Sequence, residues 1–141
     1  MKTKTTLILL LTALLLFTAS CDNAGNAPVP ANELASAAAE DIGSGETTFR
    51  FHMVDGDGNG KAWNVRTNET TVGAALVAAG LIEGDVSDFG MMVSHVNGIR
   101  ADFEEDDAWW AFFIGDEMAM VGVDSAEIES GVIYSFVFTP A

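Results

Sequence analysis

The stretch AWWAFFIGDEMAMVGVD, residues 108–124, decides the fold because it places two tryptophans side by side at the head of an apolar run. Successive side chains of a β-strand point to opposite faces of its sheet. If this run is a strand, Trp109 and Trp110 face apart. One indole then enters the core, and the other lies on the opposite, open face, where a soluble domain seldom leaves an indole without a use.

The two faces of this predicted strand differ in the size of their side chains. The set expected in the core is Trp110, Phe112 and Ile114. The set expected on the open face is Trp109, Ala111 and Phe113, in which the small Ala111 leaves a shallow slot between two rings. The alternative is that the loop over residues 115–131 folds back and covers this face.

Alternating apolar residues predict further strands on both sides of this run. TTFRFHMV (47–54) and KAWNVRT (61–67) flank the turn DGDGNG, which is typical of a hairpin. MMVSHVNGI (91–99) and VIYSFVFT (132–139) indicate two more strands. Their inward faces extend the predicted core, which gains Phe49, Phe51, Val65, Tyr134, Phe136 and Phe138.

Between the hairpin and the third strand, NETTVGAALVAAGLIEG (68–84) predicts a helix. Asn68, Thr70 or Thr71 is the expected cap, and Gly80 and Gly84 flank the end. The order β-β-α-β-β-β predicts the α+β class, with a mixed sheet of about five strands and one Ala-rich helix packed across one face.

The N-terminal part of the chain has the composition of a leader and a linker. Residues 1–20 combine Lys2 and Lys4 with a short apolar core, which predicts a cleaved export signal. Residues 21–46 predict a flexible tether, and the domain is expected at residues 47–141. TASC, residues 18–21, resembles the bacterial lipobox, which implies lipid on Cys21 and a position on the extracytoplasmic face of a membrane. Ordinary cleavage that leaves a free thiol is the alternative.

The chain is strongly acidic. It carries 21 Asp and Glu residues, and outside residues 1–20 it has four basic residues (Arg50, Lys61, Arg66 and Arg100). This balance excludes nucleic acid and anionic lipid head groups as natural partners of the domain surface.

The ordered set TVGAALVAAGL, VNGI, WWAFFIGDEMAMVGVD and a last apolar strand resembles the transcobalamin-like C-terminal domain family, over residues 47–139. The resemblance implies a β-grasp fold of the soluble-ligand-binding kind. In transcobalamin itself such a domain closes over cobalamin against a separate helical domain. The expected ligand-binding residues are Trp109, Trp110, Phe113, Met118, Met120 and Gly122.

Three polar motifs offer other chemistry. DGDGNG, residues 55–60, begins like a calcium loop, but Arg66 stands where the closing glutamate belongs, so a hairpin turn is favoured. The acidic run over residues 104–107 could hold a hard cation or support acid/base chemistry, but an exposed run of this kind is more often a solvated loop.

Ser94 and His95 are adjacent on a predicted strand and are expected to face apart. His95 with Met91, Met118 or Met120 would suit Cu(I), although methionine is more often core filler.

These observations predict a non-catalytic, membrane-anchored lipoprotein that binds a soluble ligand, with cobalamin or another corrinoid as the candidate that the resemblance implies. The alternative is a surface module that docks a transporter subunit or another surface protein. Catalysis is the weakest interpretation, because no nucleophile–base pair and no metal-ligand set is visible.

Overall fold

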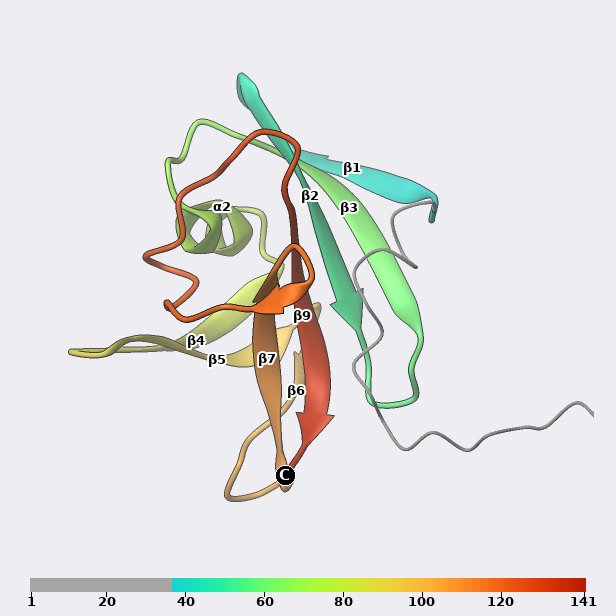
Figure 1. Ribbon diagram of the computed structural model, residues 1–141, viewed down its shortest axis with the longest axis vertical. Helices are drawn as coiled ribbons and strands as arrows, with labels where there is room; N and C mark the ends of the chain where they lie inside the picture. The colour runs from blue at the N-terminus through green and yellow to red at the C-terminus, as the bar shows by residue number, and fades with distance from the viewer. Residues whose placement is uncertain (1–36) are drawn as a thin grey trace, which may run out of the picture.

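The computed structural model describes residues 37–141, shown in Figure 1. The predicted export signal and Cys21 lie outside the described residues. The elements are β1 (Ala39–Gly43), β2 (Thr47–Val54), β3 (Gly60–Thr67), α2 (Val72–Ala78), β4 (Ile82–Ser87), β5 (Gly90–Val96), β6 (Ile99–Arg100), β7 (Ala108–Ile114), β8 (Glu117–Met118) and β9 (Ile133–Pro140). No helix in this part of the chain is long and apolar enough to cross a membrane.

The larger sheet has the strand order β1-β3-β2-β9-β7-β8 and is mixed. The predicted hairpin is confirmed, since β2 and β3 pair antiparallel with Phe51 opposite Trp63. The pairs β1–β3 and β2–β9 are parallel, whereas β7–β9 is antiparallel. The α+β class and a mixed sheet are therefore confirmed.

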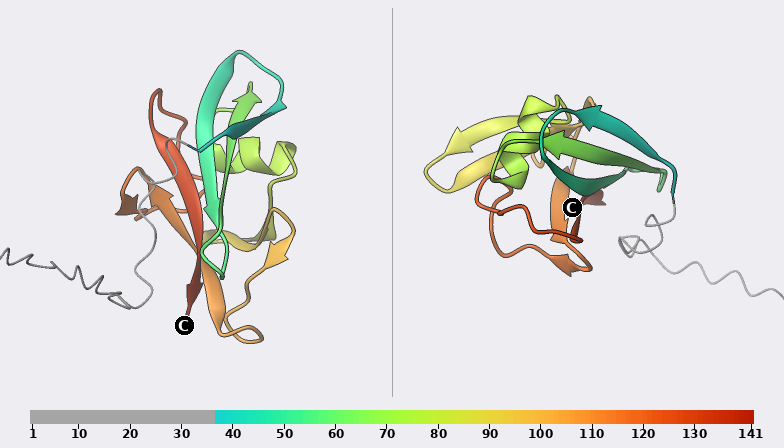
Figure 2. Two further views of the ribbon diagram at one scale, coloured as in Figure 1. Left: turned by 90° about the vertical axis from the view of Figure 1, so that its right-hand side faces the viewer. Right: turned by 90° about the horizontal axis from the view of Figure 1, so that it is seen from above.

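The predicted single sheet of about five strands is wrong, because β4, β5 and β6 form a separate three-stranded sheet. Residues 82–84, expected at the end of the helix, begin β4, which pairs antiparallel with β5 across a bulge between Glu83 and Gly84. A Cβ atom on Gly84 would lie 2.1 Å from the carbonyl oxygen of Met92, so only glycine fits at this crossing. The β4–β5 hairpin projects from the body of the domain (Figures 1 and 2).

Helix α2 is shorter than expected and begins at the third of the proposed caps. The Thr71 side chain accepts a hydrogen bond from the backbone N–H of Ala74. The helix buries Val72, Ala75 and Leu76 in the core. It ends because Gly80, with φ +70°, adopts a left-handed conformation that glycine allows at little cost. Figure 2 shows α2 against one face of the large sheet.

Strand β1 corrects the predicted boundary between tether and domain. Residues 39–43 lie inside the range 21–46, yet they pair in parallel with β3, with Ile42 opposite Val65. Ile42 packs against the core as a partly buried side chain. This anchor is one isolated apolar residue in a polar stretch, and such a residue gives no periodicity that would predict a strand.

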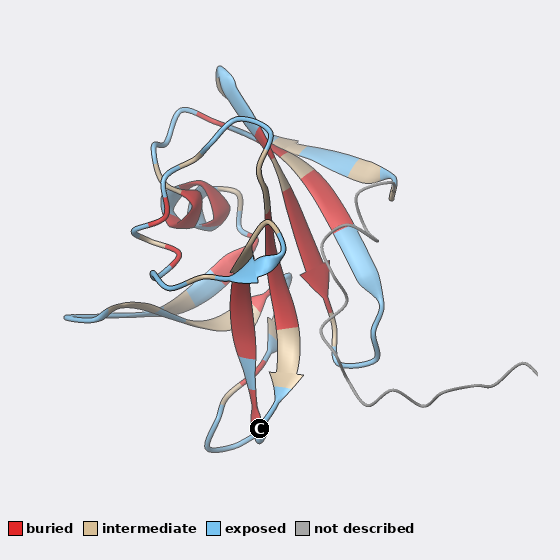
Figure 3. Ribbon diagram, in the orientation of Figure 1, coloured by how far each residue is buried: buried red, intermediate tan, exposed pale blue. Residues whose placement is uncertain are grey.

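The core lies between the large sheet and α2, and the buried strand centres are shown in Figure 3. Of the predicted core residues, Phe49, Phe51, Val65, Trp110, Phe112, Tyr134 and Phe136 are buried. Ile114 and Phe138 are only partly buried and pack against its border. Trp63, which was not predicted, is 1% exposed and stacks on Phe51 with ring centroids 5.6 Å apart.

Candidate functional site

An apolar groove of about 290 Å³ lies between the β7–β8 hairpin and β5. Its walls come from both sheets: Trp109, Trp110 and Phe112 of β7 face Met91, Met92 and Val93 of β5. Strand β9 flanks β7 on one side, and β8 pairs only with its last two residues. The remaining edge of β7 borders the groove, so side chains from both faces of the strand reach it.

The two tryptophans have different roles in this groove. Trp110 is 5% exposed, packs edge-on against Phe138 with centroids 5.5 Å apart, and donates its indole N–H to the Ile99 carbonyl at 3.2 Å. Its position is therefore fixed by a polar and an apolar contact. Trp109 is 37% exposed and forms part of the rim. The predicted separation into one buried and one exposed indole is confirmed.

The segment after β7 supplies the second wall. Gly115, with φ +61°, turns the chain into β8, and the Ala119 N–H donates to the Phe112 carbonyl at 2.9 Å. This turn brings Met118 and Gly122 to the groove, opposite Met92. Thioether side chains are flexible and polarisable, so a wall of methionines adapts to ligands of different outline.

The groove contains four of the six predicted ligand-binding residues: Trp109, Trp110, Met118 and Gly122. Phe113 and Met120 are not among its lining residues. Phe113 lies on the same face of β7 as Trp109 but further along the strand and is half-buried, and Met120 is 97% exposed. The structure thus gathers the tryptophans and Met118 at the edge of β7.

The predicted open platform of Trp109, Ala111 and Phe113 is wrong. Ala111 is 1% exposed and lies opposite the buried Val137 of β9. The methyl group of Ala111 is small, and the larger side chains beside it on β7 and opposite it on β9 screen it from water. The methionines of β5 were missed as groove residues, because their approach to β7 depends on the packing of two sheets that no periodicity records.

Tyr134 holds the segment that follows the groove residues. Its hydroxyl donates to the Glu127 carbonyl at 2.9 Å and accepts from the Glu129 N–H at 2.8 Å. Burial raises the pKa of Tyr134, and the nearby Glu129 carboxylate acts in the same direction. This clamp fixes the segment between β8 and β9, and thereby the wall that carries Met118 and Gly122.

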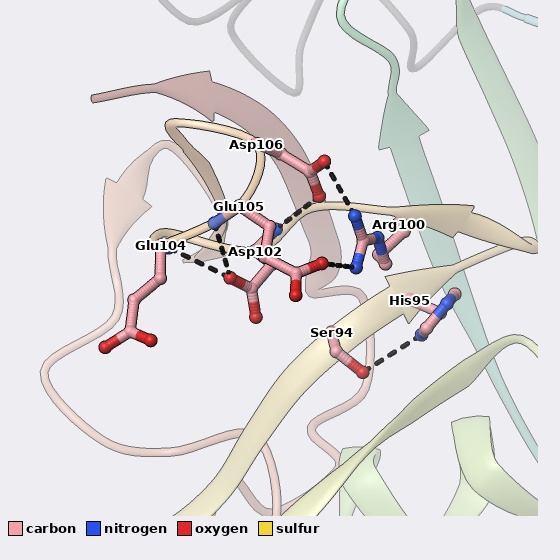
Figure 4. Close-up of polar contacts among 7 residues, drawn as sticks. All are labelled: Ser94, His95, Arg100, Asp102, Glu104, Glu105 and Asp106. Atoms are coloured by element: carbon pink, nitrogen blue, oxygen red, sulfur yellow. Dashed lines mark hydrogen bonds and ion pairs between the residues drawn. The ribbon is translucent and has the colours of Figure 1, made fainter.

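The acidic run is organised by hydrogen bonds within the loop, as Figure 4 shows. The Asp102 carboxylate accepts from the N–H groups of Glu104 and Glu105, both at 2.9 Å. Arg100 forms ion pairs with Glu105 and, at 2.9 Å, with Asp106. The hydrogen bond to Glu105 and the charge of Asp106 raise the pKa of Arg100. The loop therefore uses its charges to set its own shape.

Ser94 and His95 are in contact, so the expectation that they face apart is wrong (Figure 4). The adjacent bulge at Glu83 distorts the strand pair here. Ser94 Oγ lies 3.0 Å from His95 Nδ1 and 3.4 Å from the Glu83 carbonyl oxygen. A hydroxyl has one proton, so both bonds form together only when Ser94 donates to Glu83 and Nδ1–H donates to Ser94. In that tautomer the imidazole does not activate the hydroxyl.

The structure places two of the four proposed copper ligands in the groove and the other two outside it. Met91 and Met118 line the groove, but His95 is not among its lining residues and Met120 projects into solvent. Within residues 37–141, no three His, Cys, Asp or Glu side chains are grouped so that they could hold a metal ion.

The motif over residues 55–60 forms a hairpin turn. The Asp55 carboxylate accepts from the N–H groups of Asp57 and Asn59 at 2.9 and 2.8 Å, and from the Asn59 side chain at 3.1 Å. Slight burial acts to raise the pKa of Asp55, but the hydrogen bonds from Asn59 and Asp57 outweigh it and lower the pKa. The carboxylate is engaged with the turn itself.

Two solved structures share the fold. One is a proposed metal-binding protein from Ruminococcus gnavus ATCC 29149, with a TM-score of 0.64 and 19% identity over 68% of this chain and 99% of that one. The other is haptocorrin in complex with cobinamide, with a TM-score of 0.53 and 15% identity over 66% of this chain. The chain spans 25% of haptocorrin. No curated protein matches the sequence.

A family match begins within the β2–β3 turn and covers β3, α2, the small sheet, β7 and β8. It extends over residues 58–132, just over half of the chain. The chain therefore belongs to the family described as Domain of unknown function (DUF4430).

Proposed function

We propose that this domain binds a flat, largely apolar small molecule in the groove between β7 and β5 and does not transform it. The observation that carries the proposal is the pairing of a half-exposed indole, Trp109, with the thioethers of Met91, Met92 and Met118 around one groove. Aromatic and thioether side chains bind the faces and edges of planar ligands through dispersion and release of water.

The size of the groove limits how a ligand sits. Its volume of about 290 Å³ is at the lower end of the range for drug-sized molecules. A ligand as large as a corrinoid would be held along one edge or face, and the rest would project beyond Trp109. The domain is then one half of an enclosure that a second surface completes.

A corrinoid is the ligand class we favour. The support is the fold shared with haptocorrin, which has been seen in complex with cobinamide. At 15% identity this similarity shows the fold, and the ligand is part of the proposal. We also propose that lipid on Cys21, the sole cysteine, holds the protein on the extracytoplasmic face of a membrane.

The binding proposal is tested by equilibrium dialysis of the protein against cobinamide, cobalamin and protoporphyrin. We expect retention of at least one corrinoid, and Trp109→Ala should weaken it by about tenfold or more, as for a central aromatic contact. Phe103→Ala is the matched control, because Phe103 is 65% exposed and does not line the groove. Equal retention by wild type and Trp109→Ala would contradict the proposed site.

The anchoring proposal has a separate test. Cys21→Ala should move the protein from the membrane fraction to the soluble fraction and abolish incorporation of labelled fatty acid. If the wild-type protein incorporates no label, the anchor is absent, whatever the outcome of the dialysis.

A further inference from the structure

Six large apolar side chains lie exposed on two segments that flank the groove. We call them the docking face: Val86, Phe89, Met92, Met118, Met120 and Val121. The first three belong to the projecting β4–β5 hairpin, and the others follow β7. The exposed hairpin tip is visible in Figure 3. Exposed apolar side chains gathered on neighbouring segments mark interaction sites.

The two segments are adjacent in space. A Cβ atom on Gly90, at the tip of the hairpin, would lie 3.0 Å from a carboxylate oxygen of Asp124. Met91 lines both the groove beside Trp109 and a second groove of about 450 Å³ between α2 and β4. Residues of the docking face thus border both grooves, which share Met91 as a lining residue.

A ligand in the groove leaves much of this face in water. Phe89 is 99% exposed and Met120 is 97% exposed, and neither lines the groove. Their burial requires a partner that extends across the hairpin and the segment after β8. A macromolecular surface has that extent.

The charges around the docking face are of one sign. No Lys or Arg occurs over residues 67–99 or 101–141. The β4–β5 hairpin carries Asp85 and Asp88. Asp116 lies in the turn between β7 and β8, and Glu117 is the first residue of β8. Arg100 between the two stretches is engaged by Glu105 and Asp106. Anionic lipid and a second copy of this acidic face would both be repelled.

We propose that the docking face binds a protein segment whose apolar side chains are flanked by Lys or Arg, such as one face of a basic amphipathic helix. The apolar centre supplies the affinity, and the acidic rim selects the sign of the partner's charge. Met92, Met118 and Val121 of the docking face also line the groove, so binding of a protein segment is tested without a corrinoid, and its outcome does not depend on whether the groove holds one.

The test uses three synthetic peptides, each long enough for about five helical turns (about 18 residues), composed of Leu and Lys, Leu and Glu, or Ser and Lys. Fluorescence anisotropy at about 0.15 M salt measures binding to the wild-type protein. We expect the Leu/Lys peptide to bind and the Leu/Glu peptide not to bind. The affinity of the Ser/Lys peptide should be lower than that of the Leu/Lys peptide by at least about tenfold. Equal binding of the two Lys peptides would overturn the proposal.

Two sets of variants locate the site. Phe89→Ser with Met92→Ser and Met120→Ser should weaken binding of the Leu/Lys peptide by about tenfold, whereas Phe103→Ser should not. Changing Asp85, Asp88 and Glu117 to their amides should weaken binding of the Leu/Lys peptide. The control set is Glu46, Asp57 and Glu104, whose change to amides alters the net charge equally and should weaken binding less. Unchanged binding in the triple Ser variant, or equal losses in the two charge sets, would refute the site.

Sedimentation of the protein without peptide is the remaining arm. We expect a monomer, since the acidic rims repel each other. A dimer that the triple Ser variant dissociates would show that a second copy occupies the docking face, and would overturn the proposal.

Discussion

Trp109 and Trp110 leave β7 on opposite faces of the sheet and yet line the same groove. The groove lies at the edge of the strand, where both faces are accessible. Trp110 is locked by Ile99 and Phe138, whereas Trp109 remains 37% exposed. One indole therefore supports the site, and its neighbour is available to a ligand.

Truncation of the two tryptophans should separate these roles. Trp110→Ala removes a buried ring and should lower the free energy of unfolding by about 3–5 kcal/mol. Trp109→Ala should lower it by about 1 kcal/mol or less, since much of the ring is already in water. Urea denaturation of both variants measures the difference. Equal losses would mean that both rings serve the core alone.

Tyr134→Phe tests the clamp on the groove wall. The change leaves the Glu129 N–H and the Glu127 carbonyl without this partner, and should cost about 1–3 kcal/mol in the free energy of unfolding. Because the folded-state pKa of Tyr134 is raised, its contribution is present below the unfolded pKa of about 10 and is lost as the pH rises through the folded pKa. Thermal melts between neutral and alkaline pH should show that the stability difference between wild type and variant shrinks in alkali. A constant difference would contradict the clamp.

Asp55→Ala tests the hairpin turn in acid. The folded-state pKa of Asp55 is lowered, so its contribution is present above the unfolded pKa of about 3.9 and is lost as the pH falls through the folded pKa. The variant should be less stable than wild type near neutral pH, and the two should converge below about pH 4. Added calcium should change neither melting temperature. A rise for wild type alone would show that the motif holds the cation.

Gly73→Ala inverts a general rule. In an unhindered helix interior this change gains up to about 1 kcal/mol. Here the added methyl would lie 2.8 Å from Asp124 Cα and 2.9 Å from the Val123 carbonyl oxygen. We therefore expect a loss of about 1–3 kcal/mol from overpacking, measured by urea denaturation. Stabilisation by the variant would show that α2 and the segment at Val123 are not in this close contact.

The strands with regular alternation could be predicted from the sequence. The strands predicted at residues 47–54, 61–67 and 132–139, and in the apolar run that starts at residue 108, correspond within one residue to β2, β3, β9 and β7, because each has one buried apolar set. Strand β4 has no such set: only Ile82 is buried, and pairing with β5 across a bulge holds the rest. The Asn-Gly pair at residues 97–98 is typical of a tight hairpin turn. Both residues have positive φ and form the turn between β5 and β6.

The candidate site was predictable only in part. The tryptophans and Met118 follow from the apolar run that contains them, but the groove depends on how the β4–β5 hairpin packs beside β7. That arrangement is a long-range contact between two sheets, and local periodicity does not encode it. For the same reason Met91 and Met92 entered the site from a strand that was predicted without a role in the groove.

The most direct test of the proposed function observes the three indole N–H signals by ¹⁵N–¹H correlation NMR during titration with cobinamide. Trp63 is the internal control, since it is 1% exposed and does not line the groove. We predict saturable shifts of the Trp109 and Trp110 signals, larger for Trp109, while the Trp63 signal stays in place. Absence of any shift, or equal shifts of all three signals, would contradict ligand binding in the groove.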